Sequence, residues 1–208
     1  CTVNGRVYCA PVNIHSAQWL WLSHVAYESS GVAVPTNWDE FIAAGETLKA
    51  NGVTPITIGT KWLWTAGGVF DYLNLRTNGY DFHMALTSGE IPWTDDRVRA
   101  TMANYQQLID GDFFLEDHAA LSWQEALAPM ANGKAAMYIM GNFAVAPLKE
   151  LGLDDSSLGL FQFPEITPGI PMAEEAPTDT LHLTAGAKNV VDAKRFLAYA
   201  ARPDVQTC

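Results

Sequence analysis

The sequence is short of positive charge. Its 208 residues include 12 Lys and Arg against 23 Asp and Glu, which gives a formal net charge of -11. Nucleic acids and anionic membranes attract proteins through basic surfaces, so we expect neither as a partner. A small neutral or cationic ligand is compatible with this charge.

Long apolar runs are also missing. No stretch reaches the roughly 18 to 20 residues that cross a bilayer, and the first residues, CTVNGRVYCAPV, lack the charged and apolar regions of a signal peptide. We therefore expect the chain, as given, to be soluble. Its hydrophobic content of 49% is enough for a substantial core.

Cysteine is scarce, and its three copies form no metal-binding pattern, because no Cys-x-x-Cys occurs. Cys9 lies in an apolar segment with no basic neighbour and no helix start, which predicts a buried, unreactive thiol. Cys1 and Cys208 occupy the two ends of the chain. Two interpretations stay open for them: coincidence, or a disulfide that joins the termini.

The sequence contains none of the enzyme motifs G-x-S-x-G, G-x-x-x-x-G-K-[ST], G-x-G-x-x-G and H-E-x-x-H. A glycosidase-like pair of carboxylates stays open, although Asp154/Asp155 and Glu174/Glu175 are typical of solvated loops, since adjacent residues rarely flank one bond. The histidines show no metal-ligand spacing, so we expect no metal site and histidines that lie on the surface or are hydrogen-bonded. These are His15, His24, His83, His118 and His182.

Strands and helices alternate in the predicted secondary structure. Strands are expected at 6–14, 53–59, 134–141, 159–163 and 180–186. Helices are expected at 19–29, between Asn37 and Gly52, at 95–110 with Thr94 as cap, at 122–133 and at 189–202. This order predicts an α/β fold with helices flanking a mixed or parallel sheet, in which ITI, AMYI and LFQF are strands of one sheet.

Two tryptophans stand where a strand ends. Trp62 and Trp64 follow the strand at 53–59 directly, and open α/β sheets bind ligands beyond the carboxyl ends of their strands. Indole faces pack well against the apolar face of a pyranose ring. We therefore predict that at least one of the two, Trp64 in the first place, stacks on a sugar. Four others lie in helical patterns and are expected in the core: Trp19, Trp21, Trp38 and Trp123.

Four stretches, in this order along the chain, resemble the solute-binding proteins of ABC sugar importers, the group that includes maltose- and glucose-binding proteins. They are NGRVYCAPVN, PTNWDEF, GVTP and NGKAAMYIMGNF. The resemblance implies an α/β, periplasmic-binding-protein-like lobe with a mixed sheet flanked by helices. It also implies a binding protein without catalysis or cofactor, located in the periplasm or, as a lipoprotein, on the cell surface. Such a protein delivers a mono- or oligosaccharide to an ABC permease.

The resemblance also places the ligand contacts. The turn after ITIG, the residues after MYIMG, the polar position before the last strand and a residue near the lobe crossing are expected to touch the sugar. In this sequence they are Lys61, Trp62, Trp64, Asn142, Phe143, Asp179 and His15.

Full members of the group are roughly twice as long. We therefore expect one sugar-binding lobe, 12–178, and two pieces, 1–11 and 179–208, that border or belong to another lobe whose remainder is absent. Both ends then fall where the chain of the family passes between lobes, so Cys1 and Cys208 could be neighbours in space. A disulfide between them is what we expect of a lobe that was cut out of the longer protein by design. The helix at 189–202 would lose its usual neighbour, and its apolar face predicts either a homodimer or repacking against another surface of the chain.

Two other classes of protein stay open from the residues alone. One is a carbohydrate-active enzyme domain of the glycoside hydrolase kind. The other is a structural or interaction module that binds no sugar, in which Trp62 and Trp64 would be buried in the core.

Overall fold

The structure is a computed structural model that describes residues 2–16 and 19–206. The chain forms two compact units, which are described separately. The larger unit is Ala17–Glu174, and the smaller unit combines Cys1–Ser16 with Glu175–Cys208. The lobe boundaries at 12 and 178 stay a prediction.

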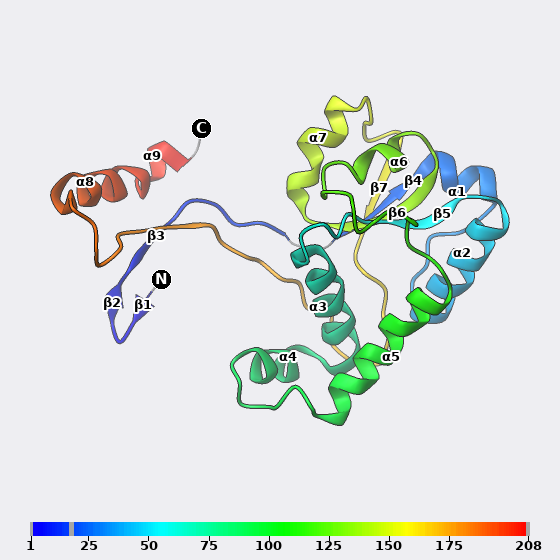
Figure 1. The fold of residues 1–208 in the computed structure, drawn as a ribbon, viewed down its shortest axis with the longest axis horizontal. Coiled ribbons are helices and arrows are strands. Elements are labelled where there is room, and N and C mark those ends of the chain that lie inside the picture. Colours follow the sequence, from blue (N-terminus) through cyan, green and yellow to red (C-terminus); the bar gives the residue numbers. More distant parts are fainter. Residues whose placement is uncertain (1, 17–18, 207–208) are drawn as a thin grey trace. The chain divides into compact units, whose positions relative to one another are not determined.

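A four-stranded mixed sheet, in the order β5-β6-β4-β7, forms the centre of the larger unit (Figure 1). Its strands are β4 (Trp19–Ser23), β5 (Thr54–Thr57), β6 (Ala135–Met140) and β7 (Leu158–Phe161). β5 and β6 are parallel, and β4 is antiparallel to both of its neighbours. The prediction that the ITI, AMYI and LFQF segments contribute to one sheet is confirmed.

The larger unit also contains helices. They are α1 (His24–Ser30), α2 (Trp38–Ala50), α3 (Trp64–Asn78), α4 (Tyr80–Thr87), α5 (Asp96–Asp110), α6 (Leu127–Ala131), the 3-10 turn η1 (Asn142–Ala144) and α7 (Val145–Glu150). Most of them cover the sheet, whereas α4 packs on α3. Among the residues that the structure describes, no helix has both the length and the apolar character that crossing a membrane requires.

Both faces of the sheet are buried. Leu20 and Leu22 of β4 pack in one core with residues of α1, α2, α3 and α5. Trp21, between them in the sequence, packs in a second core with α6 and α7. β6 follows the same alternation, with Met137 in the first core and Tyr138 in the second. Helices therefore lie on both sides of the sheet (Figure 1).

The predicted helix at 19–29 is wrong in its first half. Residues Trp19–Ser23 form the central strand β4, and α1 begins at His24 after the cap Ser23. A strand that is buried on both faces lacks alternating polar residues, so its apolar run also matches the spacing of a helix.

Other boundaries differ less from the predictions. α2 begins after the cap Asn37, as predicted. The cap of α5 is Asp95 rather than Thr94, because the Asp95 carboxylate accepts the backbone N–H of Arg97 at 2.9 Å. The segment 122–133 was predicted to be helical throughout, but it forms turns and then the five-residue helix α6.

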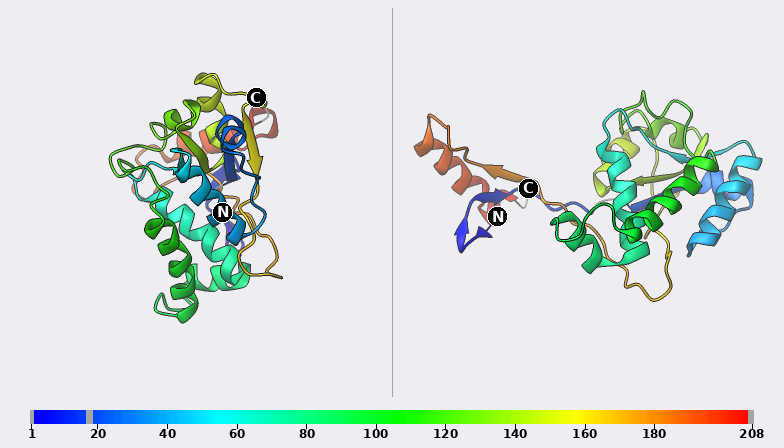
Figure 2. Two further views of the ribbon diagram at one scale, coloured as in Figure 1. Left: turned by 90° about the vertical axis from the view of Figure 1, so that its right-hand side faces the viewer. Right: turned by 60° about the horizontal axis from the view of Figure 1, so that its bottom comes forward.

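In its described residues, the smaller unit contains two short ladders and two helices, which are drawn in Figure 2. β1 (Thr2–Val3) pairs with β2 (Arg6–Val7), and β3 (Cys9–Pro11) pairs antiparallel with β8 (Thr180–His182). α8 (Val190–Ala200) packs against β3, and α9 (Pro203–Gln206) follows it. The predicted strand at 6–14 is therefore two shorter strands, and the second ends at Pro11, which has no N–H to donate.

Candidate functional site

The loops that follow β5 and β6 emerge at one edge of the sheet. The two strands are parallel, with Thr57 opposite Tyr138, so their carboxyl ends point the same way. Trp19, the first residue of antiparallel β4, lies opposite Met140 at this edge. Ligands of open α/β sheets bind beyond the carboxyl ends of the strands. This edge is therefore the candidate site.

Aromatic side chains gather there. The ring centroids of Trp64 and Phe143 are 6.1 Å apart, and Trp123 meets Phe143 edge-on at 5.2 Å. Together with Trp62 we call these residues the aromatic wall. The side chains of Trp62 and Trp64 are 59% and 46% exposed. The alternative of a structural module required both rings in the core, and the structure does not place them there.

Backbone contacts fix the loop after β5. The N–H groups of Thr60 and Lys61 donate to the carbonyl oxygens of His118 and Leu121, at 2.8 Å and 3.0 Å. A Cβ at Gly59 would lie 2.1 Å from a backbone oxygen of the same neighbouring segment, so only glycine fits there. The loop that precedes Trp62 is thus held in one conformation before any ligand arrives.

The loop after β6 is also closely packed. A Cβ at Gly141 would lie 2.4 Å from the ring of Phe143, and the hydroxyl of Tyr138 donates to the carbonyl oxygen of Trp123 at 2.8 Å. The side-chain oxygen of Asn142 is buried and has no hydrogen-bond partner among the described residues. A buried acceptor without a donor is rare in folded proteins, which singles out Asn142 beside the aromatic wall.

Charged groups lie near the wall. Lys61 is exposed. The N–H and hydroxyl of Ser122, and to a smaller extent the Lys61 charge, hold the pKa of the Glu125 carboxyl below its usual value. The site therefore offers a cation and an ionised carboxylate for ligand hydroxyls. Glu125 was not among the predicted site residues. It lies in a turn before α6, where the sequence predicted a regular helix.

The structure brings His15 and Asp179 together in the smaller unit. The Asp179 carboxylate lies 2.8 Å from the side-chain amide nitrogen of Asn13 and 2.9 Å from Nε2 of His15. These two hydrogen bonds, Asn13 first, lower the pKa of Asp179. The N–H of Val12 donates to the Asp179 carbonyl oxygen at 2.8 Å. The pair thus joins the two chain segments of the smaller unit.

Each histidine is hydrogen-bonded to another group of the protein, as predicted. The pairs are His15 with Asp179, His24 with Ser156, His83 with Asn74, His118 with Thr60, and His182 with Thr180.

Cys9 differs from its prediction. It is buried, but its sulfur is part of a disulfide, so the expectation of a free thiol is wrong. Cys1 and Cys208 lie outside the described residues, and a bond between them stays a prediction.

Comparison with known proteins gives a family and several relatives. The sequence profile of a family described as bacterial extracellular solute-binding protein matches residues 2–207. An uncharacterized ABC transporter extracellular-binding protein of Pyrococcus horikoshii is 28% identical over 209 residues, which is 98% of this chain and 45% of the relative. A probable sugar-binding periplasmic protein of Brucella suis is 34% identical over 158 residues, which is 72% of this chain and 35% of the relative.

A solved structure agrees with these relatives. The bacterial solute receptor AcbH, described with an exclusive preference for β-D-galactopyranose, superposes with a TM-score of 0.84 at 30% identity, over 99% of this chain and 52% of its own. Nearly the whole of this chain matches these relatives, but it spans only about half of their length. The likeness confirms the α/β fold with a mixed sheet flanked by helices. The family whose profile matches is one of solute-binding proteins, as the resemblance implied, and not one of glycoside hydrolases.

Proposed function

The chain belongs to the family of bacterial extracellular solute-binding proteins, and we propose that it binds a sugar on its aromatic wall. One observation carries the proposal: two exposed indoles stand at the carboxyl edge of the sheet, where a loop that the neighbouring segment holds in place leads into α3. Neighbouring apolar rings that form an exposed patch commonly mark a binding site, whereas single exposed rings do not. Preorganised rings bind a ligand at a lower entropic cost.

The polar groups around the wall fit a sugar. Lys61, in the loop after β5, supplies a donor, and Glu125, in the turn before α6, supplies an acceptor. The partly exposed Asn142, after β6, supplies an amide. An aromatic face with a few polar groups at its border is the usual arrangement for a ring that is apolar on its faces and hydroxylated at its edges. We assign the stacking contact to Trp64, which Phe143 supports, and a second contact to the more exposed Trp62.

The names of the relatives favour the same ligand class. One is called a probable sugar-binding periplasmic protein, and AcbH, at 30% identity, is described with a preference for β-D-galactopyranose. We therefore propose a pyranose, as a monosaccharide or as a residue of an oligosaccharide.

Saturation-transfer NMR on this chain tests the proposal with a panel of mono- and disaccharides that includes D-galactose. We expect weak, saturable binding, on the order of millimolar, because this unit alone covers one side of a ligand. Galactitol is the matched control, since it has the hydroxyls of galactose but no pyranose ring. A panel in which no sugar exceeds galactitol would contradict the proposal.

For the whole protein we propose the role of its family. It would act outside the cytoplasmic membrane and deliver its sugar to an ABC permease. Attachment to the cell surface as a lipoprotein is part of this proposal. Labelling of intact cells with an impermeant reagent would test the location, and loss of sugar uptake on deletion of the gene would test the role.

Self-association is a separate proposal for this chain. The smaller unit exposes Val7, Val191, Phe196 and Tyr199, at 74%, 63%, 58% and 54%. Exposed apolar surface of this kind tends to become buried in a neighbour, and a homodimer would do so. Sedimentation velocity is expected to show a dimer that the Phe196→Glu variant loses. A wild-type chain that stays monomeric over the accessible concentration range would contradict it.

A further inference from the structure

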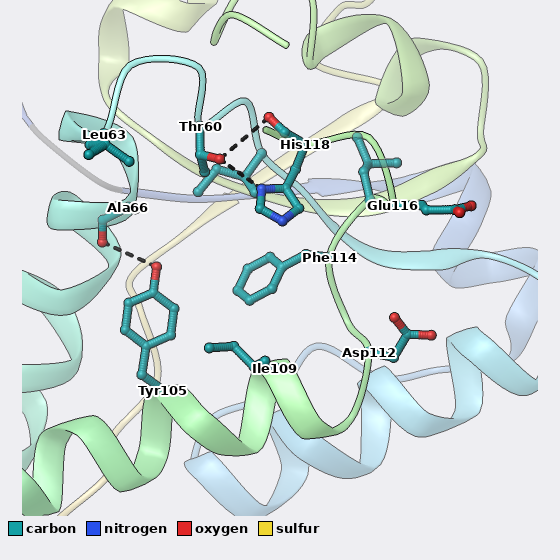
Figure 3. Close-up of a pocket in the computed structure, with 11 residues that line it drawn as sticks. Thr60, Leu63, Ala66, Tyr105, Ile109, Asp112, Phe114, Glu116 and His118 are labelled. Atoms are coloured by element: carbon teal, nitrogen blue, oxygen red, sulfur yellow. Dashed lines mark hydrogen bonds between the residues drawn. The ribbon is translucent and has the colours of Figure 1, made fainter. Parts of the chain in front are cut away.

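A pocket of about 480 Å³ opens in the larger unit, apart from the aromatic wall. It lies between the end of β5, the first turn of α3, the last turns of α5 and the loop after α5 (Figure 3). Neither Trp62, Trp64, Trp123 nor Phe143 lines it. Its volume falls within the range of pockets that hold small organic ligands.

The walls of this pocket are mainly apolar. Ile58 is fully buried at one side, and Leu63 and Ile109 are exposed at others. The ring of Phe114 stands in the middle, with its centroid 6.3 Å from Tyr105 and 6.2 Å from His118 (Figure 3). A flat ring entering the pocket would therefore meet aromatic faces and edges.

Tyr105 contributes its ring rather than a charge. Its hydroxyl donates to the carbonyl oxygen of Ala66 at 3.2 Å, and burial raises the pKa of Tyr105 to about 12. The phenol thus stays neutral at physiological pH.

Two groups of the pocket are open to a ligand. Nδ1 of His118 is 2.7 Å from the Thr60 hydroxyl, which leaves Nε2 pointing toward Phe114 (Figure 3). Glu116 stands at the rim, and its exposed side chain is directed away from the Phe114 ring (Figure 3). Within the described part of the chain no hydrogen bond or ion pair engages its carboxylate, so it is free to turn toward a ligand. The other carboxylate of the pocket, Asp112, is paired with Lys49 at 3.1 Å.

We propose that this pocket is a second small-molecule site, which takes a compound that joins an aromatic ring to a protonated amine. The ring would lie against Phe114 and Tyr105, and the amine would meet the Glu116 carboxylate. An ammonium group beside an aromatic face and a carboxylate gains from both. The net charge of -11 attracts cations to the whole surface. The inference does not depend on the sugar site.

Protein-observed NMR with 2-phenylethylamine tests the proposal. We expect saturable shifts of the methyl signals of Ile58, Leu63 and Ile109, since a bound ring would shift protons close to it. 3-Phenylpropionate is the matched probe, because it has the same ring and linker but the opposite charge. It is expected to bind about threefold to fivefold more weakly, because an ion pair at an exposed carboxylate accounts for about that factor.

Variants locate the charge. Glu116→Gln is expected to weaken 2-phenylethylamine binding about threefold to fivefold, and to leave 3-phenylpropionate binding unchanged or slightly tighter. Glu150→Gln on α7 makes the same change in net charge away from the pocket and is expected to have no effect. The proposal would be overturned if 2-phenylethylamine and 3-phenylpropionate bound equally well. Equal losses of amine binding in Glu116→Gln and Glu150→Gln, or NMR shifts confined to residues outside the pocket, would also overturn it. If a sugar that binds the aromatic wall displaced 2-phenylethylamine, the pocket would not be a separate site, and the proposal would be overturned.

Discussion

Among the described residues, two of the tryptophans donate hydrogen bonds from their indole N–H groups to the protein, and two others do not. The N–H of Trp21 donates to the carbonyl oxygen of Met140 at 2.9 Å, and that of Trp38 donates to a side-chain amide oxygen on α5 at 2.8 Å. Both rings are buried. Trp62 and Trp64 make no such bond within the described residues and are exposed. Buried polar groups are hydrogen-bonded, so the first pair stabilises the fold and the second remains available to a ligand.

The sequence predicted much of this division. Trp38 follows a cap and belongs to a regular helix, and Trp62 and Trp64 follow a strand end, so their local patterns carried the information. Trp123 was expected in the core, but it is half-buried and packs edge-on against Phe143. That contact joins segments that lie far apart in the sequence, and no local pattern reports it.

Asp179 gives a prediction for the dependence of stability on pH. Hydrogen bonds from Asn13 and His15 lower its pKa from the ordinary value of 3.8. A carboxylate with a lowered pKa stabilises the fold above that ordinary value, and this contribution is lost as the pH falls through its folded pKa. We expect Asp179→Asn to reduce the hydrogen-exchange protection of the Val12 and His15 amides at pH 7. The difference from the wild type should shrink below pH 3.8.

Asn13→Asp is a useful comparison, because it places a second carboxylate beside Asp179 and should raise that pKa. A difference between wild type and Asp179→Asn that is the same at pH 7 and pH 3 would contradict a role for the ionised carboxylate.

At the scale of elements, the start of α2 depends on a small number of polar atoms. The side-chain oxygen of Asn37 accepts the N–H of Glu40 at 3.0 Å, and the Glu40 carboxylate accepts the N–H of Thr36 at 2.8 Å. We expect Asn37→Ala to lower the free energy of unfolding by about 1 kcal/mol, since one N–H of the first turn loses its partner. Urea unfolding followed by circular dichroism measures this.

Asn37→Asp keeps an acceptor and a favourable charge at the helix start, so it should unfold close to the wild type. Equal losses in Ala and Asp variants would show that the cap does not stabilise α2.

Among the elements, β4 shows the limit of local patterns most clearly. The residues WLWLS repeat apolar side chains without alternation because helices cover both faces of the strand. Only the neighbouring strands β6 and β7 decide that this run is extended. α2, β5 and β6 were predictable because caps, proline and flanking glycines mark their ends. The loops of the candidate site were located by the strands before them, whereas the pocket beside His118 depends on the tertiary packing of α3 against α5.

At the scale of the whole chain, the three cysteines allow two competing arrangements. The structure places Cys9 in a disulfide, and the sequence predicts a bond between Cys1 and Cys208. Each sulfur forms one such bond, so a chain with three cysteines cannot contain both within itself. Peptide mapping after alkylation without reductant is expected to find Cys9 in a linked peptide. An alkylated Cys9 beside a linked Cys1–Cys208 pair would contradict the structure and support the sequence prediction.

The chain spans about half the length of relatives that it matches end to end, so its aromatic wall is one side of the ligand environment that we propose. Rings that stack on a sugar gain most when the partner side excludes water. We therefore expect the wall to select a pyranose while the affinity of this chain stays low. Selectivity and affinity are then set by different parts of the whole protein.

The central claim is that the sugar lies on the indoles of the wall, and titration of tryptophan variants with the sugar that binds best tests it most directly. Trp64→Ala is expected to weaken binding about tenfold and Trp62→Ala to a smaller extent, with the fold intact by circular dichroism. Trp93→Ala is the matched control, because Trp93 is also 59% exposed but packs on Phe70, away from the wall. Unchanged affinity in both wall variants, or an equal loss in Trp93→Ala, would contradict the account.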